Sequence, residues 1–152
     1  MVDFFVVKEG DFGRIEVVKH HHDLVVHAHP YTHFSFWLGG GLAHSRVGQH
    51  TVQIGPDVAL GVNSNASHDF RLNDANKAAV FLNLYLNDAW LDAQCKNMAH
   101  AMVLPHPSIG ITPEVHAVRT KLLTHLASPV RGHALCLEAD VASLLSTTLM
   151  SA

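Results

Sequence analysis

The chain has 152 residues, of which 48% are hydrophobic and 15% charged, a composition typical of one globular domain and not of a disordered chain. Its formal net charge is −3, and its Lys and Arg residues are scattered, so the concentrated basic face that binds nucleic-acid backbones is absent and we expect no direct nucleic-acid contact. No apolar run approaches the ~20 residues of a membrane span, and we expect no membrane association.

The N-terminus, "MVDFFVVKEG", lacks the basic start and the small-residue cleavage site of a secretory signal. The chain has two cysteines, Cys95 and Cys136, and both fall in stretches with helical periodicity. This usage predicts a reduced, cytoplasmic protein and not a disulfide framework.

The first half of the chain has the pattern of short β-strands. They are rich in β-branched and aromatic residues and are separated by Gly, Pro, Asn and Asp clusters: 14–18, 23–29, 33–38, 42–47, 50–54, 58–62, 67–72 and 77–86. Regular short strands with such turns favour an antiparallel sandwich or barrel. Strand–helix–strand alternation is missing here, so we expect no parallel sheet.

The second half changes to helical periodicity. A helix is predicted from Asn87 to about residue 101, capped by Asn87 or Asp88. A loop containing Pro105, Pro107 and Gly110 follows, and the next helix takes Thr112 as its cap and Pro113 as its first residue. Two apolar stripes then recur at helical spacing: Val115, Val118, Leu122 and Leu126, and Leu137, Val141, Leu144, Leu145 and Leu149.

The predicted fold is therefore mainly β: a jelly-roll-like barrel over residues 1–86, followed over residues 87–152 by two or three C-terminal helices that form a helical hairpin. We expect one structural domain. The apolar stripes of the helices must be buried, either on the outer face of the barrel or against a second copy of the chain. There is room for both, and we expect a homodimer through these helices.

Three histidines within seven positions, followed by an aromatic strand, mark the candidate site: "HAHPYTHFSFWLGG" over residues 27–40. Alternate residues of a strand share a face, which groups Val25 with His27 and His29, and His33 with Ser35 and Trp37. The opposite, wholly apolar face, Phe34, Phe36 and Leu38, should pack on the helices. A further histidine, His68, begins a later strand. We expect His27, His29, His33, Ser35, Trp37 and His68 to line a pocket inside the barrel.

Two interpretations of the four histidines stay open. Converging neutral imidazoles would bind a divalent transition metal such as Zn, Ni or Fe. Without a metal, burial and mutual repulsion would keep the rings uncharged, as hydrogen-bonding groups for a polar ligand. Trp37 would stack on a ligand or fill the core. We expect Asp69 to point outward, His20, His21 and His22 to form a surface turn, and no acidic residue or nucleophile to accompany the cluster.

The spacing of His27, His29, His33 and Gly40 resembles the first motif of the cupin family, which usually has glutamate where this chain has His33. Gly55-Pro56 followed by His68 resembles the second motif, with the Pro-Gly order reversed. The resemblance implies a cupin barrel with His27, His29, His33 and His68 as candidate metal ligands. Leu72 stands where the family usually has asparagine.

The barrel, the segment "VFLNLYLNDAWLDAQ" (80–94) and the trailing helices together resemble the N-terminal sensor domain of arabinose-regulator (AraC)-type transcription factors. The resemblance implies an effector-binding and dimerisation domain whose DNA-binding helix-turn-helix part is absent from this chain. The expected effector is a sugar or an aromatic or polar metabolite, and no enzymatic activity is expected. The alternatives are a stand-alone metal-dependent cupin enzyme of the dioxygenase or isomerase type, and a storage or carrier cupin.

Overall fold

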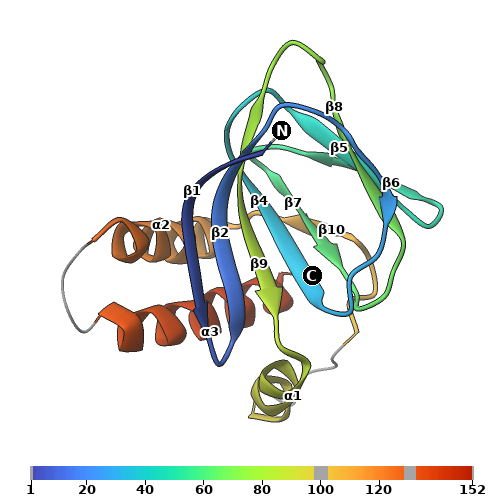
Figure 1. Ribbon diagram of the computed structural model, residues 1–152. Helices are drawn as coiled ribbons and strands as arrows, with labels where there is room; N and C mark the ends of the chain where they lie inside the picture. Colours follow the sequence, from blue (N-terminus) through green and yellow to red (C-terminus); the bar gives the residue numbers. More distant parts are fainter. Residues whose placement is uncertain (1, 98–102, 129–132, 152) are drawn as a thin grey trace.

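The computed structural model describes residues 2–97, 103–128 and 133–151. The strands are β1 (Val2–Gly10), β2 (Gly13–His20), β3 (Leu24–His27), β4 (Thr32–Gly40), β5 (Ala43–Val47), β6 (His50–Ile54), β7 (Val58–Val62), β8 (His68–Leu72), β9 (Ala79–Leu86) and β10 (Ser108–Gly110). The helices are α1 (Asp88–Asn97), α2 (Pro113–Ala127) and α3 (His133–Met150). Figure 1 shows the strands as a curved double-layered body with α2 and α3 along one side.

The strands form two antiparallel sheets. The larger sheet has the order β1-β2-β9-β4-β7-β10, and the smaller has the order β3-β8-β5-β6. Non-consecutive neighbours such as β2 with β9 and β4 with β7 show that the chain crosses repeatedly between the sheets, the connectivity of a jelly roll. The fold class predicted from the sequence, a mainly β antiparallel barrel followed by C-terminal helices, is confirmed.

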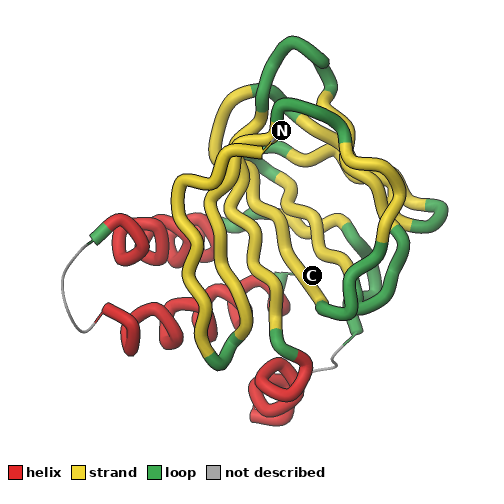
Figure 2. Tube along the Cα trace, viewed as in Figure 1, coloured by secondary structure: helices red, strands yellow, loops and turns green. Residues whose placement is uncertain are grey.

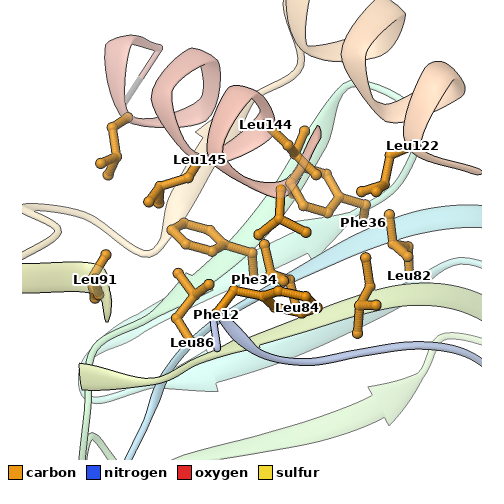
Figure 3. Packing of buried hydrophobic residues seen from close by; sticks show 14 of the residues in the cluster. Phe12, Phe34, Phe36, Leu82, Leu84, Leu86, Leu91, Leu122, Leu144 and Leu145 are labelled. Carbon is orange, nitrogen blue, oxygen red and sulfur yellow. The ribbon is translucent and has the colours of Figure 1, made fainter. Parts of the chain in front are cut away.

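Helices α2 and α3 cover the outer face of the six-stranded sheet (Figure 2). The buried cluster between them contains Phe34 and Phe36 of β4 together with Leu122 of α2 and Leu144 of α3 (Figure 3). The prediction that Phe34 and Phe36 pack on the helices is therefore confirmed. Both apolar stripes of the helices are buried against the barrel of the same chain. Their burial therefore does not require a second copy of the chain.

A second apolar cluster fills most of the barrel interior between the two sheets. It includes Val52 and Ile54 of β6, Phe70 of β8 and Phe81 of β9, all less than one-tenth exposed. The interior is therefore a packed core with polar residues gathered toward one end, and that end holds the candidate site.

The helix caps follow the sequence. The Thr112 hydroxyl accepts a hydrogen bond from the backbone N–H of Val115 at 3.2 Å, and Pro113 opens α2. Asn87 Oδ1 accepts hydrogen bonds from the N–H groups of Ala89 and Trp90, so Asn87 caps α1. The helix predicted from residue 87 is observed up to Asn97, and its last part lies outside the described residues.

Two strands escaped prediction. β1 pairs along β2 as a hairpin through the turn at Asp11–Phe12, although its burial lacks a period of two because most of its side chains are exposed. β10 lies in the segment predicted as a loop, where three residues pair with β7. None of the helices within the described residues is long and apolar enough to span a membrane.

Candidate ligand and metal site

Strand pairing brings two of the predicted histidines face to face. His27 of β3 is the direct partner of His68 of β8, so their side chains share the inner face of the smaller sheet, with ring centroids 4.3 Å apart. His29, just beyond β3, lies 4.8 Å from His27 and 5.3 Å from His68 by the same measure. Residues from two elements separated by some forty positions thus form one cluster of imidazoles.

The fourth histidine comes from the opposite sheet. His33 of β4 pairs with Tyr85 of β9, and its ring centroid lies 4.8 Å from that of His68 and 5.2 Å from that of His29. The side chain is buried. The structure therefore brings all four predicted histidines together.

Backbone carbonyls fix the tautomers of two rings. Nδ1 of His27 lies 2.6 Å from the carbonyl oxygen of Val25, and Nδ1 of His68 lies 2.9 Å from that of Ala66. A carbonyl can only accept, so each Nδ1 donates a proton and each Nε2 keeps its lone pair. This is the arrangement in which protein histidines coordinate metals, with the second nitrogen held by an outer partner.

The donor set fits a transition metal. One ligand nitrogen from each of His27, His29 and His68 can be chosen so that all three lie within 4.8 Å of one another. Imidazole nitrogens suit Zn, Ni and Fe and leave open positions for water or a ligand. His33 adjoins this group without belonging to the set of three, so a four-histidine site stays a prediction.

The cavity around these rings is small, about 120 Å³. Ser35 contributes to its lining, as expected, together with the four histidines. Trp37 lies deeper, against the interior apolar cluster, and its indole N–H donates to the Gly41 carbonyl at 2.9 Å, so it does not line the cavity. Val25 is 83% exposed because the register shifts between Leu24 and His27, which breaks the alternation assumed for β3.

An acidic residue from outside the predicted motif lies near the cluster. Glu16 of β2 is buried, and its Oε1 accepts a hydrogen bond from Asn83 while Oε2 accepts two from Arg14. Tyr85, which lines the cavity, also forms a side-chain hydrogen bond with Glu16. Burial, together with the charge and hydrogen bond of Glu16, raises the pKa of the Tyr85 hydroxyl well above its ordinary value.

The environments of Asp69 and His20 differ from those expected. Asp69 alternates away from His68 as predicted but is buried, and its carboxylate accepts hydrogen bonds from the Arg46 backbone N–H and from the side chain of Arg71, two residues further along β8. Burial alone would raise the pKa of Asp69, but these donors outweigh it and lower the pKa. His20 is the last residue of β2 and not part of a surface turn; its buried ring lies 4.7 Å from that of Phe70.

Three of the four rings in the cluster, those of His29, His33 and His68, lie where protonation is disfavoured. Burial is the largest cause in lowering the pKa of His20, His29, His33 and His68. For His33, burial and the neighbouring imidazoles of His68, His29 and His27 lower the pKa to about 3. A neutral imidazole offers a lone pair to a metal or to a hydrogen-bond donor.

Comparison with known proteins gives likeness at the level of structure. No family model matches the chain, and no curated protein matches it. A cupin superfamily protein from Desulfitobacterium hafniense is 11% identical, with a TM-score of 0.47 over 57% of this chain and 79% of its own. A putative mannose-6-phosphate isomerase from Ralstonia eutropha is 15% identical, with a TM-score of 0.49 over 57% of this chain and 85% of its own.

The AraC-like transcriptional activator CuxR is similar in structure to 99% of this chain, with a TM-score of 0.64 and 10% sequence identity. The chain spans 56% of the length of CuxR. At this identity the likeness shows a shared fold, which here extends over the barrel and the helices that follow it.

Proposed function

We propose that this chain is the small-molecule-sensing and dimerisation domain of a transcriptional regulator. The observation that carries the proposal is the likeness to CuxR, which includes the C-terminal helices as well as the barrel. The effector would bind at the open end of the barrel, where polar and aromatic side chains gather around the histidine cluster.

The proposed dimer would form through the outward faces of the C-terminal helices, since their apolar stripes already pack on the barrel. Within the described part of α3, the exposed residues include Ala139 and Ser143, whose small side chains allow two helices to approach closely. The effector would change the regulator only through a difference in its affinity for two states of the dimer.

Two measurements test this function. Sedimentation equilibrium should give a dimer at high micromolar concentration, and a thermal-shift screen of sugars and aromatic metabolites should find a stabilising compound. The chain is then fused to a DNA-binding module that requires dimerisation, and the compound should change reporter expression. A monomer at every concentration would contradict the dimer, and a stabilising compound with no effect on the fusion would contradict the regulatory role.

A metal-dependent enzyme is the second candidate, and the fixed tautomers of His27 and His68 favour it. In that case His27, His29 and His68 would hold the ion, which would supply Lewis acidity or an activated water. Glu16 and Tyr85 would orient a substrate beside it. Elemental analysis of untagged protein should then find stoichiometric metal that is lost in both His27→Ala and His68→Ala but kept in His50→Ala, an exposed histidine outside the cluster. Metal retained by all three variants would contradict this site.

A further inference from the structure

A second hollow adjoins the histidine cavity on the side of the β1–β2 hairpin. We call it the hairpin groove: about 510 Å³, lined by Phe4, Arg14, Glu16, His29, Tyr31 and Tyr85 among others. His29 and Tyr85 line both the groove and the histidine cavity, so the two spaces meet at these side chains. The segment around His29 therefore forms the wall between a small buried chamber and a larger open one.

Volume separates the roles of the two spaces. Ligand pockets in proteins usually hold roughly 300–1,000 Å³. The groove, at about 510 Å³, falls in this range, whereas the cavity, at about 120 Å³, has room only for an ion, waters or a small functional group. We propose that the hairpin groove binds the body of the effector, an aromatic compound without an acidic group, and that one end of it reaches His29. This inference rests on the proposed sensing function.

Aromatic side chains dominate the available surface of the groove. Phe4 is 54% exposed and Tyr31 is 44% exposed, so each ring keeps part of its surface available to a ligand although Arg14 lies over one face of Phe4. The rings of His29 and Tyr31 are nearly parallel, 21° apart, with centroids 6.3 Å apart, and Tyr85 meets Tyr31 edge-on. Exposed apolar rings around a hollow of ligand size are what a planar aromatic ligand needs for stacking.

Several polar groups of the groove, Arg14, Glu16 and Asn87, already have hydrogen-bond partners in the protein. Arg14 donates to Glu16 through Nε and Nη2, at 3.1 and 2.9 Å, and its guanidinium lies over the Phe4 ring. Asn87 uses its Oδ1 to cap α1. A sugar placed here would leave many hydroxyl groups without partners, a cost that an aromatic ring avoids.

The charge of the groove disfavours anions. Glu9 and Glu16 line it together with a single cation, Arg14, that is already paired with Glu16. A carboxylate ligand would face an excess of negative charge, while a phenol or an aromatic amine would not. The aromatic lining of the groove therefore favours an aromatic ligand, and its negative charge disfavours an acidic one.

The test is an NMR titration of ¹⁵N-labelled, chelator-treated protein with phenol, tyramine, benzoate and glucose. Phenol and tyramine should shift the amides of Gly13, Arg14 and Asn87, which line the groove, and benzoate and glucose should shift them little. Phe4→Ala should raise the dissociation constant for phenol roughly three- to tenfold. Phe5→Ala is the matched control, because Phe5 is equally exposed on the same strand but does not line the groove.

Each outcome bears on the proposal. Equal binding of benzoate and phenol would overturn the charge argument, and preferential binding of glucose would overturn the ligand class. Phenol shifts confined to Ser35 and Leu60 of the interior, unchanged in Phe4→Ala, would overturn the groove and leave the sensing function standing. No binding by any of the four would overturn the groove, whereas the sensing function is judged separately by the fusion reporter and the dimer measurement.

Discussion

Truncating Leu122 tests whether the helices and the barrel form one folding unit. Leu122 is fully buried in α2, in the cluster that it shares with Phe36 and Leu82 and toward which it points in Figure 3. Leu→Ala at enclosed sites costs about 3–5 kcal/mol, from lost transfer energy and the cavity left behind. For a domain of this length each kcal/mol lowers the Tm by about 2–4 °C, so Leu122→Ala should lower it by roughly 6–20 °C.

The assay is thermal and urea unfolding, both followed by circular dichroism, with Leu123→Ala as the matched control. Leu123 is the next residue on the same helix and is only partly buried, so the same truncation should cost about 1 kcal/mol. Both variants should unfold in a single transition, because helix and barrel share a core. Equal stability of the two variants, or a separate helical transition in Leu122→Ala, would refute the packing argument.

Three further predictions concern the cluster, the cap and the buried carboxylate. Folding lowers the pKa of His33 from 6.5 to about 3, so as the pH falls the unfolded chain takes up a proton at this side chain before the folded protein does. The free energy of unfolding therefore keeps its full value above pH 6.5 and decreases below it, by about 2 kcal/mol between pH 8 and pH 5. In urea unfolding of chelator-treated protein, His33→Asn should reduce the loss of stability between pH 8 and pH 5 by about this amount, leaving the smaller contribution of the other buried histidines, and an unchanged slope would assign the titration elsewhere. Thr112→Ala should cost about 1 kcal/mol through the lost cap, while Thr120→Ala, at an exposed mid-helix site, should be near neutral in the same assay. Asp69→Ala should cost about 1–3 kcal/mol by leaving the Arg46 N–H without its acceptor, and a melting temperature equal to that of the parent would contradict the buried hydrogen bond.

Strand and helix positions could be predicted where a short-range pattern encodes them. β6 and β7 begin and end where the alternation and turn residues place them, and Thr112 with Pro113 fixes the start of α2. β1 escaped because an edge strand exposed along most of its length has no buried face to impose a period of two. β10 is only three residues long, and its pairing with β7 is a tertiary contact that no local pattern records.

The candidate site was predictable in part for the same reason. The local repeat His27-x-His29 and its neighbour His33 stand out in one short stretch, but Glu16 and Tyr85 do not. Their proximity depends on the registers of β2 with β9 and of β9 with β4, which place Glu16 beside Asn83 and Tyr85 beside His33. Alternation on β9 could have grouped Asn83 with Tyr85, but it could not show that this face is the inner one.

In the proposed sensing role, the six-stranded sheet would connect the ligand groove with helices α2 and α3. On β2, Glu16 faces the groove while its neighbour Ile15 is buried under the helices; on β9, Tyr85 faces the groove while Leu84 and Leu86 lie in the helix-side cluster. A ligand on the inner face therefore touches residues whose direct neighbours support α2 and α3. Because cores are closely packed, a displacement of these strands must be accommodated at the helices. The size of the response is bounded by the ligand's differential affinity for the two arrangements, so an effector that binds tightly without moving β2 or β9 would leave the helices unchanged.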